Sequence, residues 1–210
     1  GEGVFTDLGG NKYEGEWKND EFNGNGKFNY ANGDSYEGKW KDNVYSGKGT
    51  YLSRSGEKYV GMWSKGLKDG QGIIVNSNKD KYTGLWIEDR RNGDGIQEYS
   101  NGDVYEGEWK NNQKHGNGSM LYASGEKYIG NWDKGLKNGN GSQSYLNGDI
   151  YSGNWVNNQR YGKGKINYIN GDFYDGDWHN DKIQGAGIFQ YVDGSTYNGD
   201  WINGRKNGRG

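Results

Sequence analysis

Tryptophan recurs at a fixed period of 23 residues along the whole chain. The nine Trp residues are Trp17, Trp40, Trp63, Trp86, Trp109, Trp132, Trp155, Trp178 and Trp201. A Tyr lies four residues before each Trp and a Gly two residues before it, so Tyr-x-Gly-x-Trp occurs nine times in one phase. A constant period of this length predicts a repeat architecture, in which each unit buries its apolar side chains against its neighbours.

Glycine is in excess in this chain, and aliphatic residues are scarce. The 210 residues include 41 Gly but no Pro and no Cys. Ile, Leu, Val and Phe make up about 14% of the chain, which excludes a conventional aliphatic core. The 9 Trp, 18 Tyr and formal charge of −2 argue against a disordered chain. No apolar run approaches the ~18 residues of a transmembrane helix, and the lack of Cys excludes disulfides and thiolate metal sites. We therefore expect a protein with an aromatic core, in a reducing compartment.

Two short segments of each repeat alternate between apolar or Gly residues and polar residues. Residues 12–18 place Tyr13, Gly15 and Trp17 on one face, and residues 24–30 place two Gly, Phe28 and Tyr30 on one face. Strict alternation predicts strands with one solvated face, so we expect 18 antiparallel strands, two per repeat.

The requirement that aromatic residues share a face also predicts the strand register. A three-residue loop at positions 32–34, with Gly33 in the left-handed conformation, would connect one pair of strands. A loop with an even number of residues between Lys18 and Asn23 would connect the next pair. The expected facing pairs are Phe28 with Gly38, Gly26 with Trp40, Trp17 with Gly24, and Tyr13 with Phe28. In most of these pairs a large side chain lies over a glycine.

The pattern Tyr-x-Gly-x-Trp-x-x-[Gly/Asn/Asp]-x-x-x-Gly-x-Gly at this period closely resembles the MORN repeat family (membrane occupation and recognition nexus). The resemblance covers residues 1–210 as one continuous array of about nine repeats, and we expect the array to be an excerpt of a longer chain. It implies an all-β fold, an elongated single-layer antiparallel sheet of stacked β-hairpins that forms a rod with a groove. The residues expected to line the groove are Tyr13, Trp17, Tyr36, Trp40, Tyr59, Trp63, Tyr82, Trp86, Tyr105, Trp109, Tyr128, Trp132, Tyr151, Trp155, Tyr174, Trp178, Tyr197 and Trp201.

Three residues depart from the repeat pattern. Ser53 and Asn76 stand where six other repeats have a second-strand Tyr, and Lys79 stands where the other repeats have a turn Gly. We expect the packing to differ between residues 53 and 79.

The resemblance also implies a function. Proteins of this family are usually non-catalytic scaffolds that organise cytoskeletal, ciliary or membrane-associated assemblies through protein–protein contacts and homo-oligomerisation. The expected location is the cytoplasm, at the cytoskeleton, a cilium or the inner face of a membrane, with no cofactor and no nucleic acid as a partner. The alternative is a phosphoinositide-binding module that targets an enzyme, such as a lipid kinase, encoded outside this segment.

Charged residues recur at two positions of the repeat. A basic residue follows Trp in the predicted loop of six repeats, as Lys68, Arg91, Lys114, Lys137, Arg160 and Lys206. An acidic residue follows the other turn in seven repeats, as Asp34, Glu57, Asp80, Asp103, Glu126, Asp149 and Asp172. The first interpretation is that the acidic residues stabilise turns by local hydrogen bonds and that the basic ones are solvated. The second is that the six basic residues form an edge that meets anionic headgroups or an acidic partner.

The remaining candidate sites are weak. His115 and His179 differ in repeat phase, which argues against a shared metal site or a catalytic base. The pairs Glu106/Glu108 and Asp175/Asp177 fall on the predicted polar face, and an acid–base pair would need one buried member. We expect no catalytic, cofactor or metal residues. A carbohydrate- or choline-binding repeat, with Trp and Tyr cages around a quaternary ammonium, is a third class to test.

Overall fold

The structure is a computed structural model that describes residues 1–208. It divides into two compact units, one of Gly1–Asn101 with Trp109–Asn112 and one of residues 102–108 with the residues from 113 onward. Every regular element in residues 1–208 is a β-strand. In this described part of the chain, no helix is long and apolar enough to cross a membrane.

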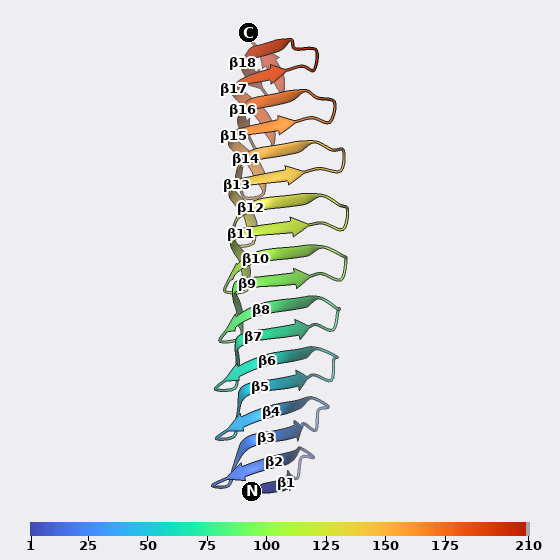
Figure 1. Cartoon of the computed structure of the whole chain (residues 1–210), viewed down its shortest axis with the longest axis vertical. Coiled ribbons are helices and arrows are strands. Elements are labelled where there is room, and N and C mark those ends of the chain that lie inside the picture. Colours follow the sequence, from blue (N-terminus) through green and yellow to red (C-terminus); the bar gives the residue numbers. More distant parts are fainter. Residues whose placement is uncertain (209–210) are drawn as a thin grey trace. The chain divides into compact units, whose positions relative to one another are not determined.

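The first unit is an antiparallel sheet of hairpins. Its strands are β1 (Glu2–Thr6), β2 (Lys12–Lys18), β3 (Glu21–Asn29), β4 (Ser35–Lys41), β5 (Val44–Leu52), β6 (Lys58–Ser64), β7 (Leu67–Val75), β8 (Lys81–Ile87) and β9 (Arg90–Glu98). Each strand pairs with the next one in the sequence. Figure 1 shows these strands following one another in chain order, joined by short loops.

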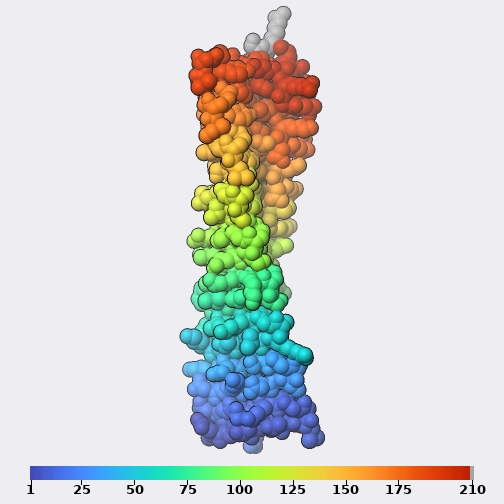
Figure 2. Space-filling model, turned by 90° about the vertical axis from the view of Figure 1, so that its right-hand side faces the viewer, coloured from blue at the N-terminus to red at the C-terminus, as the bar shows by residue number. Residues whose placement is uncertain are grey.

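The second unit repeats the same arrangement. Its strands are β11 (Gln113–Leu121), β12 (Lys127–Asp133), β13 (Leu136–Ser144), β14 (Ile150–Val156), β15 (Gln159–Asn167), β16 (Phe173–His179), β17 (Lys182–Gln190), β18 (Thr196–Ile202) and β19 (Arg205–Asn207), while β10 (Val104–Lys110) supplies residues to both units. In Figure 2, successive repeats of a unit form adjoining bands of colour. The predicted all-β fold of stacked antiparallel hairpins is confirmed. The described strands number 19 instead of 18, because the second strand of the repeat occurs in part at both ends of the array.

The hairpin turn after each Trp is shorter than the sequence analysis predicts. Asn19 and Asp20 form a two-residue turn with φ of 52° and 64°, the left-handed pair that matches the twist of a hairpin. Trp17 therefore faces Phe22, and the predicted pairing with Gly24 is wrong. Two additional residues of β3 are accommodated by a bulge, where Gly24 has a φ of 65°.

The other turn has the predicted length but a different position. The Tyr30 N–H donates to the Asp34 carbonyl at 2.9 Å, which leaves three residues between them, the last being Gly33 with a φ of 96°. This loop begins one residue earlier than predicted and shifts the register by two residues, which keeps every side chain on its predicted face. Tyr13 faces Phe28 as predicted, whereas Phe28 faces Tyr36 instead of Gly38, and Gly26 faces Gly38 instead of Trp40.

Hydrogen bonds link successive turns along both edges of each unit. At one edge the carboxylates of Asp34, Asp80, Asp103, Asp149 and Asp172 accept backbone N–H groups of the next turn at 2.8–2.9 Å. At the other edge the side-chain oxygens of Asn43, Asp89, Asn112, Asn158 and Asp181 accept the N–H of the preceding hairpin at 2.8–3.0 Å. Within the turn, the same carboxylates of Asp34, Asp80, Asp149 and Asp172 accept the side-chain amide of the Asn two residues earlier at 2.8–3.0 Å, so the predicted local hydrogen bonds are confirmed at these four residues. The bonds to the next turn were not predicted.

These carboxylates predict a loss of stability in acid. The Ser100 N–H bound to Asp80 holds the pKa of that carboxyl below its ordinary value. Its contribution is therefore complete above the unfolded pKa of about 3.9 and is lost as the pH falls through the lower folded value. Urea midpoints measured from pH 7 to pH 2 should fall less steeply for Asp80→Asn than for the wild type. Asn keeps the acceptor oxygen, as Asn11 does for the Ala31 N–H, so the midpoint at pH 7 should change little.

Candidate functional site: the aromatic face

The aromatic face is the face of each sheet that carries the Tyr and Trp of Tyr-x-Gly-x-Trp. Eight of these nine tyrosines are 0–1% exposed. In the repeat of Tyr151, the hydroxyl donates to the Asn154 carbonyl at 2.9 Å, and the ring lies over Gly153 and Gly164. A Cβ on either glycine would approach the ring or hydroxyl closer than 3.0 Å. Glycine is therefore required by the close approach of the ring to the backbone.

Within each unit, the tryptophans join neighbouring repeats into an aromatic layer. Trp155 packs edge-on against Tyr151 of its own repeat at 5.2 Å and against Tyr128 of the preceding repeat at 5.4 Å. Its indole N–H donates to the Gly141 carbonyl at 3.2 Å. Edge-to-face packing suits the ring quadrupoles, and the layer takes the place of the missing aliphatic core.

One position of the aromatic face differs in chemistry from repeat to repeat. We call it the slot position, and it is occupied by Phe22, Tyr45, Lys68, Arg91, Lys114, Lys137, Arg160, Ile183 and Lys206. Within each unit, the slot residue faces the Trp of the same hairpin, as Arg160 faces Trp155. The six basic residues predicted to lie in a loop at the edge are therefore strand residues within the aromatic face. The prediction placed them in a loop because it assumed a long turn after Trp.

The basic slot residues lie over aromatic rings. The Arg160 guanidinium carbon is 4.2 Å from the Trp178 ring centroid and 5.6 Å from that of Tyr151. Lys137 Nζ lies 4.7 Å from the Tyr128 ring and 5.0 Å from the Trp155 ring. Lys68, Arg91 and Lys114 make the same two contacts in their repeats, and Lys206 lies over Tyr191 and Tyr197. In the first two repeats an aromatic ring is stacked here instead, with Phe22 at 3.9 Å from Tyr13.

Polar groups complete the surroundings of three slot cations. Arg91 donates to Gln97 Oε1 at 2.8 Å and Lys137 to Gln143 Oε1 at 2.6 Å, and both glutamines are almost fully buried. Arg160 pairs with Asp181 at 3.0 Å. Burial lowers the pKa of Lys137 to about 8, while the rings and the amide oxygen stabilise its ammonium form. Neither glutamine was predicted as a site residue, although strand alternation places both on the aromatic face, at the repeat position of Phe28.

The basic slot residues bear on whether the chain is a choline-binding repeat, the third class named from the sequence. A choline-binding cage would need Tyr and Trp rings that are open to a quaternary ammonium. In six repeats the chain's own Lys or Arg occupies that place. This arrangement argues against choline recognition at those six positions.

A second row of tyrosines borders the slot residues. Tyr122, Tyr145 and Tyr168 are half-buried, and this burial raises the pKa of each hydroxyl. Beside Tyr145 the surface is hollowed by about 380 Å³. The hollow is lined by Glu126, Tyr145, Leu146, Asn147, Asp149, Arg160 and Ile166. It combines apolar walls with one cation and two carboxylates, a mixed lining that suits a peptide better than a lipid tail.

The departures from the pattern leave the aromatic layer intact. Ser53 stands in the tyrosine row, and its hydroxyl accepts the Glu57 N–H at 3.0 Å. Lys79 takes the left-handed conformation of the turn Gly, with a φ of 74°. Tyr59 and Tyr82, which flank this region, stay buried.

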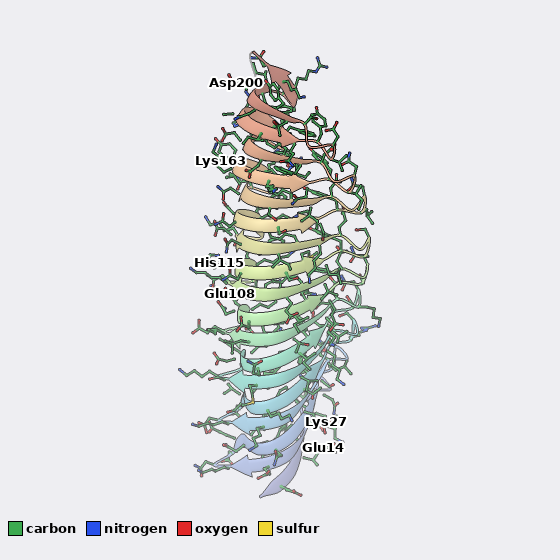
Figure 3. The ribbon with its side chains drawn as sticks, turned by 45° about the horizontal axis from the view of Figure 1, so that its top comes forward. Glu14, Lys27, Glu108, His115, Lys163 and Asp200 are labelled. Carbon is green, nitrogen blue, oxygen red and sulfur yellow. The ribbon has the colours of Figure 1, made fainter. Side chains whose placement is uncertain are left out.

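The histidines and the carboxylate pairs named from the sequence do not come together in one site. His115 Nδ1 lies 3.3 Å from Asp133, whereas the His179 ring packs against Tyr161. Glu108 accepts the Asn117 N–H at 2.8 Å, and Glu108 and His115 are labelled in Figure 3. Within residues 1–208, no group of three or more His, Cys, Asp or Glu side chains could hold a metal ion.

Solved structures share this fold at low sequence identity. The TCP10 domain of Danio rerio CPAP in complex with a peptide of Danio rerio STIL has a TM-score of 0.51 and 10% identity, covering 96% of this chain and 95% of that one. The G-box domain of the microcephaly protein CPAP has a TM-score of 0.50 and 12% identity, covering 96% and 100%. At this identity the likeness shows the fold alone.

The family comparison covers nearly the whole chain. No curated protein matches it in sequence. The model of the MORN repeat matches at residues 13–35, 36–58, 59–81, 82–104, 105–127, 128–150, 151–173, 174–196 and 197–210. These nine consecutive matches have the period of the Trp residues and of the aromatic layer, and the chain belongs to the MORN repeat family.

Proposed function

We propose that this chain is a non-catalytic scaffold that binds partner proteins along its aromatic face and organises a cytoskeletal, ciliary or membrane-associated assembly in the cytoplasm. The observation that carries the proposal is the slot position. The Tyr, Gly and Trp around it are the same in every repeat, whereas the slot itself holds Phe, Tyr, Lys, Arg or Ile. A constant framework with one variable position gives each repeat its own chemistry without changing the fold, as in other repeat proteins that bind partners.

Two further observations support protein binding. The hollow beside Tyr145 offers apolar walls and the Arg160 guanidinium to an extended chain. The TCP10 domain of CPAP, which shares the fold, was solved with a peptide of STIL. In this proposal, a partner segment lies across neighbouring hairpins and contacts the slot residue of each. We also propose self-association of the scaffold.

Peptide selection tests the proposal. Displayed peptide libraries selected on the 210-residue chain should yield binders that weaken at least about tenfold with Tyr145→Ser or Arg160→Tyr. Both substitutions use residues that other repeats carry at these positions, Ser53 and Tyr45, so the fold should be kept. The matched control is Ile188→Ser on the opposite face, which should leave binding unchanged. Binders that tolerate both substitutions would place the site elsewhere.

Phosphoinositide binding is the alternative function. The six basic residues that suggest it lie over rings within the aromatic face instead of along an edge, which favours the protein-binding function. Replacing Lys68 and Arg91 by Tyr removes two charges and keeps the slots filled, as at Tyr45. Binding to phosphoinositide-containing vesicles that is lost in this double variant would support the lipid function, and binding that is absent or unchanged would count against these residues.

A further inference from the structure

The face opposite the aromatic face, here the outer face, is charged at the start of the first unit. Lys12 and Glu14 form an ion pair at 2.6 Å, and Lys27 lies 3.6 Å from Glu37. Glu14 and Lys27 face each other in the register, and both are labelled in Figure 3. This is the expected character of a solvated sheet face.

Further along the same unit the outer face becomes apolar. Val60, Met62, Ile73, Leu85 and Ile96, here the outer patch, occupy neighbouring positions on β6 to β9. Met62, Ile73 and Ile96 are 42%, 39% and 37% exposed. A cluster of large apolar side chains on a sheet face, rimmed by polar residues, is typical of an interaction surface.

The other repeats show that the fold does not require apolar residues here. The position of Met62 and Leu85 holds Asn131 and Asn154 in the second unit, and the position of Ile73 holds Ser119 and Ser142. The strands and their pairing are the same in both units. The cluster is therefore particular to repeats three and four, and the repeat fold does not require it.

We propose that the outer patch packs against the outer patch of a second copy of this chain. The two copies would be related by a two-fold axis that lies between the two sheets and runs parallel to β7. Such an axis places β7 on β7, β6 on β8, and β5 on β9, and it makes the contact self-complementary. The two sheets would lie about 10 Å apart, as in a β-sandwich. This inference rests on the self-association part of the proposed function and names its surface.

The rows of outer-face residues match under this symmetry. In the row that includes Met62, the axis places Met62 of one copy over Leu85 of the other, and Gln71 over itself. In the same row Lys48 of one copy meets Asp94 of the other. In the next row Val60 meets Thr83, Thr50 meets Ile96, and Ile73 meets itself. The second row follows from the register, which pairs Thr50 with Val60, Val60 with Ile73, Ile73 with Thr83, and Thr83 with Ile96. The row of Met62 lies two residues away along each strand, where Lys48 pairs with Met62 and Gln71 with Leu85.

Charge complementarity supports a second copy as the occupant. The Asp94 carboxylate lies in the contact row, and a second copy presents Lys48 to it. In a third row, next to that of Ile73, Lys58 of one copy meets Lys81 of the other. The Lys81 charge is balanced by Glu98 of its own copy, whose Oε1 lies 2.8 Å from Lys81 Nζ. Five strands about 4.8 Å apart and about 20 Å long give roughly 500 Å² per copy. This area is small for a specific interface, so the dimer should dissociate in the micromolar range.

Sedimentation of the 210-residue chain as a function of concentration tests the interface. The wild type should pass from monomer to dimer, and Ile73→Ser with Met62→Asn should raise the dissociation constant at least about tenfold. Both substitutions use residues from the same positions of the second unit. The matched control Ile188→Ser alters the position of Ile73 five repeats later, where Ile188 is 42% exposed, and should leave dimerisation unchanged. A monomeric wild type, or equal effects of Ile73→Ser and Ile188→Ser, would overturn the proposal.

A charge exchange tests the two-fold arrangement itself. Lys48→Glu and Asp94→Lys should each weaken the dimer, and the double variant should restore it, because each residue meets the other across the axis. Failure of the double variant to recover would overturn the arrangement. If the wild type stays monomeric while Ile73→Ser abolishes binding to vesicles of anionic phospholipid, the occupant is a membrane and the proposal fails. Peptide binding by the aromatic face is measured separately with Tyr145→Ser, so either function can fail without the other.

Discussion

Replacing Gly72 by Ala is expected to destabilise the chain by at least about 3 kcal/mol, the upper range of overpacking costs. A Cβ at this position would lie within van der Waals overlap of the Tyr59 ring and hydroxyl, and Tyr59 is fully buried. Where space is open and the backbone is extended, Gly→Ala normally stabilises by up to about 1 kcal/mol through the unfolded state. The expected effect therefore has the opposite sign, and the urea midpoint measures it.

The matched control for Gly72 lies at a turn. Gly56→Lys introduces the residue type that Lys79 supplies at the same repeat position, where Lys79 has a φ of 74°. No atom lies within 4 Å of a Cβ added at Gly56. Its cost should be about 1 kcal/mol, that of the left-handed conformation alone. If Gly72→Ala is as stable as Gly56→Lys, the close approach of the ring to the backbone is not what requires glycine.

Replacing Tyr151 by Ala is expected to cost about 3–5 kcal/mol, the range for removing a large aromatic side chain from a core. The ring packs edge-on against Trp155 and Trp178 at 5.2 Å each, and Arg160 lies over it. The substitution therefore opens a gap in the aromatic layer and removes the support of a slot residue. Urea unfolding followed by Trp fluorescence checks the loss.

Two conservative variants separate the contributions at this site. Tyr151→Phe keeps the ring but leaves the Asn154 carbonyl without its donor, and should cost about 1 kcal/mol. Tyr145→Ser alters the partly enclosed tyrosine row and should cost clearly less than Tyr151→Ala. A loss below about 1 kcal/mol for Tyr151→Ala would mean that the aromatic layer does not act as the core.

The strands and the composition of the core follow from the sequence with few assumptions. Alternation in residues 12–18 predicts β2 with its observed bounds, and the glycines near each Tyr predict the close approach of ring and backbone. The hydrogen bond within a turn also follows from local chemistry, as where the Asn147 amide donates to the Asp149 carboxylate. The bond from that carboxylate to the next turn joins residues 20 positions apart and could not be predicted in this way.

The register and the slot position could not be predicted in the same way. Alternation fixes the face of a side chain but is unchanged by a shift of two residues, so Phe28 can face Tyr36 or Gly38 without violating it. The bulge at Gly24 depends on the two-residue turn at Asn19 and Asp20, which the sequence analysis took for a longer loop. That single difference also moved Lys68 and its equivalents from an edge to the aromatic face.

The hydrogen bonds between successive turns have a consequence for how such chains evolve. Each turn side chain binds the backbone of the adjacent hairpin, and the same bonds recur from one repeat to the next in each unit. Unequal recombination that duplicates or deletes whole 23-residue repeats therefore joins surfaces that already match, whereas an insertion whose length is not a multiple of 23 residues breaks the pattern of these bonds. Copy number can drift freely in such a gene while the phase of the repeat stays fixed.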